Sequence, residues 1–180
     1  MGSLSVSRGS MGSWNRGGSL SNTIRGNIGL GVTENDLREV FGQVIGNWVN
    51  MLTQDTSLVS QMPSSVAIER KAVLGGRAKL HLVLRVPHGF ALKIGRILDC
   101  GSDEEIVPGD IVSELLNIYC GHLKNRVWRS EEPFSVHLPE KSVIKEWPGM
   151  RPDVVCFMMA GGYPVEIMLW DSTSKVDSPP

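Results

Sequence analysis

Residues 66–86 have the sequence VAIERKAVLGGRAKLHLVLRV, which predicts a β-hairpin with one buried face. In its second half every other residue is apolar, and these positions share one face of a strand: Ala78, Leu80, Leu82, Leu84 and Val86. Gly75 and Gly76 lie between the two halves, where they permit the positive φ angles of a tight turn. The first half therefore pairs with the second as a neighbouring strand.

Residues 153–170 repeat this pattern. The segments DVVCFMMAGG and YPVEIMLW predict a second hairpin around Gly161 and Gly162. One face of its second strand carries Tyr163, Val165, Ile167 and Leu169. Residues 134–143, FSVHLPEKSV, predict a further strand and a connection.

Apolar residues at helical spacing predict a long amphipathic helix over 34–53. Thr33 offers an N-cap oxygen in front of it, with Asp36 three residues further on. The apolar positions that recur along this segment are Leu37, Val40, Phe41, Val44, Ile45, Trp48, Val49 and Leu52. One face of the helix therefore packs on the core.

Two further helices are expected between the hairpins. Residues 89–99, GFALKIGRILD, predict a short helix with Phe90, Ile94, Ile97 and Leu98 pointing inward. An uninterrupted helical pattern, DIVSELLNIYCGHLKNR, follows over 110–126. Strands separated by a few helices predict an α+β fold, with a largely antiparallel sheet and helices packed on one face.

The bulk composition predicts one domain between two tails. A chain of 180 residues that is 41% hydrophobic is long enough for one sizeable core. We place the domain at 33–170, after a Gly- and Ser-rich flexible tail at 1–32 and before a polar tail at 171–180. The first tail carries Arg8, Arg16 and Arg25 without an acid, and an inert extension is favoured over electrostatic docking.

Charge and hydropathy exclude several classes of partner. The net charge is −1 and no long run of one sign occurs, so a nucleic-acid partner is not expected. No apolar stretch approaches the roughly 20 residues that span a bilayer. The first 30 residues also lack the apolar centre of a secretory signal, so we expect a cytoplasmic protein with no membrane segment.

The cysteines and histidines offer one alternative reading. Cys100, Cys120 and Cys156 are widely spaced and lack the paired spacing of a zinc or redox site, so reduced and buried thiols are expected. A metal-dependent enzyme would have to combine them with the four histidines His81, His88, His122 and His137. We expect no metal site, because a histidine at the edge of an apolar helix face, such as His122, is more often structural.

The helix at 110–126 carries the candidate chemistry. At about 100° per residue, Glu114, Asn117 and Gly121 fall within about 40° of Asp110. The apolar residues cluster on the opposite side: Val112, Leu115, Leu116, Tyr119 and Leu123. Spacing alone favours a solvated polar face over a functional site. Without a histidine, reactive thiol or metal cluster, a carboxylate and an amide cannot supply a full nucleophile and base set, but they can orient water and hold a cation.

The pattern Asp110-x-x-x-Glu114-x-x-Asn117, followed by Gly121, Lys124 and Pro139, resembles the signature of the CheC/CheX/FliY chemotaxis phosphatases. The order of elements over about 34–170 resembles that family as well. In the first helix Glu39 is followed at the critical position by Gly42, so that helix holds no second Glu-x-x-Asn. The chain therefore resembles the CheX form, which has one motif and dimerises, and the resemblance implies a CheC/CheX-like two-layer fold.

The resemblance also implies a substrate and a division of roles. The substrate is the aspartyl phosphate of a CheY-like response-regulator receiver domain, which supplies its own Mg²⁺ and lysine, so this chain needs no cofactor of its own. Asn117 would orient the attacking water, because an amide both donates and accepts hydrogen bonds without adding negative charge. Glu114 would pair with the receiver lysine. Asp110 would support the helix start, and Pro139 would shape the connection that follows.

A second alternative remains open beside the metal-dependent enzyme. A CheX-like module with the same fold could dock a receiver or a flagellar-switch protein without hydrolysing anything. Phosphate release with a cognate receiver separates that binding module from the phosphatase. The sequence does not name the receiver or its two-component pathway.

Overall fold

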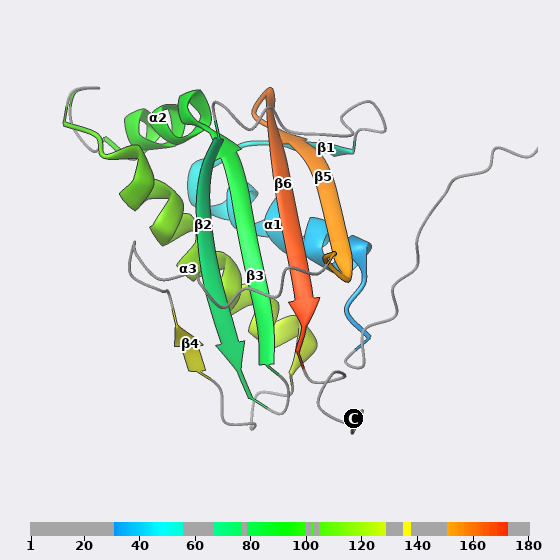
Figure 1. Cartoon of the computed structure of the whole chain (residues 1–180). Coiled ribbons are helices and arrows are strands. Elements are labelled where there is room, and N and C mark those ends of the chain that lie inside the picture. Colours follow the sequence, from blue (N-terminus) through cyan, green and yellow to red (C-terminus); the bar gives the residue numbers. More distant parts are fainter. Residues whose placement is uncertain are drawn as a thin grey trace, which may run out of the picture.

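The residues that the structure describes fold around a six-stranded antiparallel sheet (Figure 1). This structure is a computed structural model and describes residues 31–55, 67–76, 79–99, 102, 105–128, 135–137 and 151–172. The strands are β1 (Thr53–Asp55), β2 (Ala67–Gly75), β3 (Lys79–Pro87), β4 (Ser135–His137), β5 (Val154–Ala160) and β6 (Tyr163–Asp171). They lie in the order β1-β5-β6-β3-β2-β4, so the two long hairpins are neighbours at the centre.

Both predicted hairpins are confirmed. The expected apolar face of β3 is buried at Leu80, Leu82, Leu84 and Val86. Gly75, expected in the turn with a positive φ, is instead the last residue of β2, where it pairs with Lys79 and has no positive φ. Ala78 lies outside the described residues. The β5–β6 turn places Gly161 at φ 56° and Gly162 at φ 88°, angles that glycine adopts without steric cost. β4 confirms the strand expected at the start of residues 134–143.

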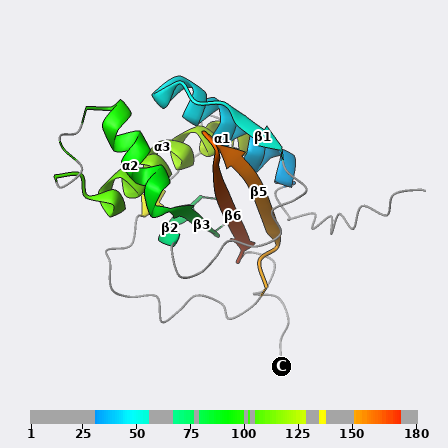
Figure 2. The ribbon, with the colours of Figure 1, turned by 90° about the horizontal axis from the view of Figure 1, so that it is seen from above.

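Helices α1 (Glu34–Val49) and α3 (Pro108–Val127) cover one face of the sheet (Figures 1 and 2). The shorter helix α2 (His88–Ile97) follows β3 and lies at one end of the sheet, beside α3. The apolar faces of the helices and the inward side chains of β2, β3, β5 and β6 form one core. This arrangement confirms the α+β fold with helices packed on one face.

Contacts between α1 and α3 fix the two helices against each other. The rings of Phe41 and Tyr119 meet edge to face with centroids 5.6 Å apart, and the Tyr119 hydroxyl donates to the Leu37 carbonyl at 3.1 Å. At the end of α3, the guanidinium of Arg126 lies 3.1 Å from the Asp36 carboxylate. Asp36 also closes the capping box of α1 with Thr33, as expected. The start of α1 therefore lies beside the end of α3, and the helices run antiparallel.

The structure corrects two expectations about element ends. Helix α1 ends at Val49 and does not continue to 53, because Asn50 adopts a left-handed conformation (φ 50°, ψ 40°) that closes the helix. The chain then enters β1, and Leu52, expected on the apolar face, is 82% exposed. Ile97, expected to point inward from α2, is 47% exposed, because α2 ends there.

Residues at the two predicted domain boundaries belong to the core or its edge. Val32 precedes α1 and is 2% exposed. Asp171 ends β6 and is also 2% exposed.

Candidate functional site

Helix α3 presents a stripe of exposed polar residues on the side opposite its buried face. Asp110, Glu114, Asn117 and Gly121 are all exposed, as the helical wheel predicts, and Lys124 is half-buried. We call these five residues the polar stripe. The buried face consists of Val112, Leu115, Leu116, Tyr119, Cys120 and Leu123. Since the buried face anchors α3, the stripe has a fixed orientation.

The two ends of α3 suit its dipole. Pro108 stands at the first helical position, where its missing N–H costs no helical hydrogen bond, and Asp110 places a negative charge in the first turn. Lys124 and Arg126 place positive charges in the last turn. Val107, the N-cap residue, has no side-chain oxygen to cap the first turn. Asp110 therefore occupies the helix-supporting position expected from the sequence.

An apolar edge, formed by Ile111 and Ile118, runs beside the stripe. Ile111 and Ile118 flank Glu114 at helical spacing, and both are half-buried against the core. A partner that reached Glu114 and Asn117 would therefore also meet apolar surface. Fixed polar groups bordered by apolar surface are typical of protein interfaces.

Gly121 has no packing reason to be a glycine within the described structure. A Cβ built at this position meets no other atom within 4 Å. A glycine in a helix can let another backbone approach closely, but within the described residues no backbone approaches Gly121. Any such approach would have to come from a partner.

Helix α1 offers no second copy of the motif. At Gly42, where a second asparagine would stand, an added Cβ would lie 2.8 Å from the Oγ1 of Thr53 in β1. The carboxylate of Glu39 is bound to Arg126 at 3.2 Å and accepts a hydrogen bond from Asn35 at 2.7 Å. β1 therefore fills the space over Gly42, and the Glu-x-x-Asn of α3 has no counterpart on α1.

The remaining candidate residues lie apart from the stripe or outside the described residues. Pro139 and Cys100 are outside the described ranges. Cys120 and Cys156 are free and buried, and burial raises the pKa of each thiol to about 12. Both are therefore reduced and buried, as expected.

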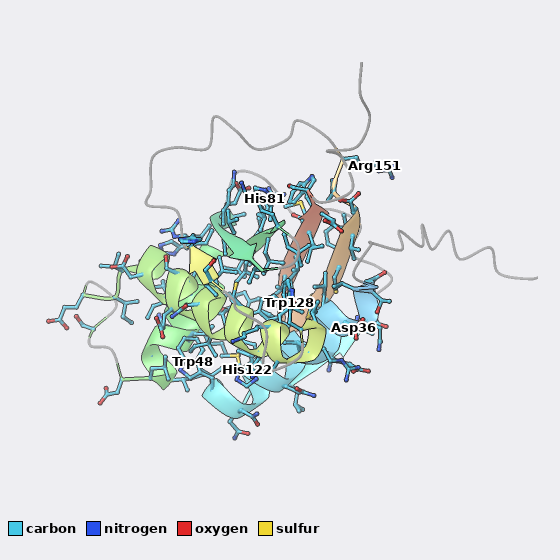
Figure 3. All side chains as sticks on the ribbon, turned by 90° about the horizontal axis from the view of Figure 1, so that it is seen from below. Asp36, Trp48, His81, His122, Trp128 and Arg151 are labelled. Atoms are coloured by element: carbon cyan, nitrogen blue, oxygen red, sulfur yellow. The ribbon has the colours of Figure 1, made fainter. Side chains whose placement is uncertain are left out.

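No metal site emerges from the described part of the chain. His81 on β3 and His122 on α3 lie on opposite sides of the molecule (Figure 3). Within the ranges that the structure describes, no three His, Cys, Asp or Glu side chains gather as potential ligands. The same ranges contain no helix long and apolar enough to span a membrane.

Sequence reasoning missed one polar residue that contacts α3. Arg70 lies on β2 between Ile68 and Ala72, on the side of the strand that faces the helices, and bonds to Gly109 and Ser113 of α3. A charged residue among the inward positions of a strand was the available signal, because such a residue needs a partner.

The fold resembles solved CheX structures. A chain in the crystal structure of the CheX–CheY–BeF₃–Mg²⁺ complex from Borrelia burgdorferi covers 76% of this chain with 96% of its own length, at 13% identity and a TM-score of 0.51. The chemotaxis protein CheX from Desulfovibrio desulfuricans covers 77% of this chain with 97% of its own length, at 10% identity and a TM-score of 0.54.

Comparisons of sequence alone do not reach this similarity. No protein-family model matches the chain, and no curated protein matches it significantly. The relation therefore rests on the order and packing of the elements over almost the whole length of those CheX chains. The chain has the fold of the CheX chemotaxis proteins.

Proposed function

We propose that this chain hydrolyses the aspartyl phosphate of a CheY-like receiver domain. The observation that carries the proposal is the pair Glu114 and Asn117, which stand exposed one turn apart on a helix anchored by its buried face. The CheX-like fold supports the proposal, since one similar structure is a complex of CheX with CheY, BeF₃ and Mg²⁺.

In the proposed reaction this chain mainly has to position the attacking water. Water attacks the phosphorus, the bond from phosphorus to the receiver carboxylate breaks, and inorganic phosphate and a free aspartate are released. The transition state is loose, so placing the water in line is the main remaining task. The Asn117 amide suits that task, because its oxygen accepts from the water and its NH₂ donates. Mg²⁺ belongs to the receiver.

Glu114 supplies recognition in this proposal. Its exposed carboxylate, one turn before Asn117, pairs with the receiver lysine, and the apolar edge of Ile111 and Ile118 excludes water around that pair. Gly121 lets the receiver backbone lie close to the helix one turn beyond Asn117. Asp110 and Lys124 border the contact at the two ends of the stripe.

A homodimer forms part of the same proposal. α1 carries no second motif, so two sites in one assembly require two chains. We place the reaction in the cytoplasm, where two-component receivers act. Molar mass by light scattering tests the assembly, and a monomer at all working concentrations would reject the dimer.

The experiment is phosphate release from a panel of receivers labelled with acetyl phosphate, with and without the full chain. At least one receiver should lose phosphate faster when the chain is present. Glu114→Ala and Glu114→Lys should both weaken binding to that receiver, and unchanged affinity would reject the lysine pairing. Binding without any acceleration would reject the phosphatase and favour a CheX-like module that docks a receiver or flagellar-switch protein.

A further inference from the structure

Arg70 joins β2 to the first turn of α3 through a set of hydrogen bonds. Its Nε donates to the Gly109 carbonyl and to the Ser113 hydroxyl oxygen, each at 3.0 Å. Its Nη1 donates to the backbone carbonyl of Glu69 at 2.9 Å. The Ser113 hydroxyl in turn donates to the Gly109 carbonyl at 2.8 Å. The guanidinium therefore joins two residues one helical turn apart to a strand of the sheet.

Gly109 makes room for this contact. A Cβ at position 109 would overlap the Nη2 atom of Arg70, so any other residue would displace the guanidinium. Glycine in a helix normally costs about 1 kcal/mol relative to alanine. At this position the cost has a structural reason, in contrast to Gly121, whose surroundings are open.

The contact lies where α3 most needs support. Val107, the N-cap residue, offers no side-chain hydrogen bond to the first turn, and an uncapped helix end frays. Gly109 and Ser113 immediately precede Asp110 and Glu114, so fraying from this end of the helix would reach Glu114 before Asn117. Asn117 lies one turn further from the end.

We propose that Arg70 is a positioning residue, which keeps the first turn of α3 wound against β2 and thereby holds Glu114 ready for the receiver lysine. It does not touch the reacting atoms. The effect of Arg70 on receiver binding rests on the proposed function, whereas its support of the first turn of α3 rests only on the contacts described above. Because Glu114 supplies recognition, loss of the Arg70 contact should affect KM more than kcat.

The experiment uses four variants of the full chain. Arg70→Ala removes the guanidinium, and Gly109→Ala displaces it while keeping the charge. The double variant tests whether both act through one contact. Arg126→Ala is the matched control, because it removes an arginine that ties the other end of α3 to α1. Amide hydrogen exchange reports on the helix, and phosphate release from an acetyl-phosphate-labelled receiver reports on function.

In Arg70→Ala and Gly109→Ala, exchange at residues 110–115 should accelerate about tenfold, as the loss of a hydrogen bond to a charged group allows. KM should rise by about the same factor, with kcat changed less than about threefold. The double variant should be no worse than Arg70→Ala, since the two changes remove one contact. Arg126→Ala should accelerate exchange only near the end of α3 and leave KM unchanged.

Other outcomes would overturn the inference. Unchanged exchange at residues 110–115 in Arg70→Ala, or slower exchange in Gly109→Ala, would show that Arg70 does not hold the first turn. Faster exchange with unchanged KM would reject the positioning role. If the wild-type chain neither binds nor dephosphorylates any receiver, the proposed function fails, and the exchange data alone decide whether Arg70 holds the turn.

Discussion

Replacing Gly121 by alanine should make the protein more stable and a poorer phosphatase. Gly121 lies inside α3, and a Cβ at this position meets nothing within 4 Å, so the added methyl group causes no clash. Alanine should therefore gain the full difference in helix propensity, about 1 kcal/mol. For a domain of this size, that gain raises the midpoint of thermal unfolding by about 3 °C.

The same methyl group should obstruct a receiver. Gly121 lies one turn beyond Asn117 in the polar stripe, and the proposed docking brings a partner backbone close to it. Gly46→Ala is the matched control, because Gly46 lies inside α1 and an added Cβ would stand 3.9 Å from the Met51 carbonyl oxygen, an ordinary contact. Both variants should be more stable than the wild type, but only Gly121→Ala should raise KM for a phosphorylated receiver.

Thermal unfolding followed by circular dichroism measures the stability, and phosphate release from an acetyl-phosphate-labelled receiver measures the activity. A Gly121→Ala protein that is less stable than the wild type would refute the claim that a methyl group at this position meets no other atom. A Gly121→Ala protein that is more stable and has an unchanged KM would refute the claim that the receiver backbone approaches Gly121 closely.

Two further predictions concern titratable groups. Cys120 and Cys156 should resist iodoacetamide at pH 8 in the native protein, because burial raises the pKa of each thiol to about 12. Intact mass in a Cys100→Ser background checks this, and alkylation before denaturation would contradict it. Burial disfavours ionisation of Asp36, but its hydrogen bonds, notably with Thr33, outweigh burial and lower its pKa. Ionised Asp36 should therefore stabilise the fold above about pH 4 and lose that effect as the pH falls further. In Asp36→Asn, the free energy of unfolding measured with urea should therefore decrease less steeply below about pH 4 than in the wild type. An equally steep decrease in the variant would refute the stabilising role of ionised Asp36.

The hairpins and the polar stripe could be predicted because each follows from a local period. The alternation from Leu80 to Val86 specifies one buried face of β3, and Gly161 and Gly162 mark a turn whose positive φ angles few other residues permit. The wheel of α3 separates Leu115 from Glu114 in the same way. Such patterns show which side chains are exposed. They do not show what the exposed groups do, and the roles of Glu114 and Asn117 came from the resemblance.

The features that sequence reasoning missed depend on contacts between distant segments or on one backbone angle. Leu52 continues the apolar period of α1, but the left-handed conformation of Asn50 ends the helix first and sends the chain into β1. The bond between Arg70 and Ser113 joins residues that are 43 positions apart, and no local pattern encodes it. The filling of the space over Gly42 by Thr53 likewise appears only when β1 is in place.

The most direct test compares two asparagines on α3. Asn117 and Asn125 are both exposed, but only Asn117 lies in the polar stripe. Phosphate release from a phosphorylated CheY-like receiver should be accelerated by the wild-type chain and equally by Asn125→Ala, while Asn117→Ala should bind the receiver and show no acceleration. Full acceleration by Asn117→Ala would contradict the central claim that this amide places the attacking water.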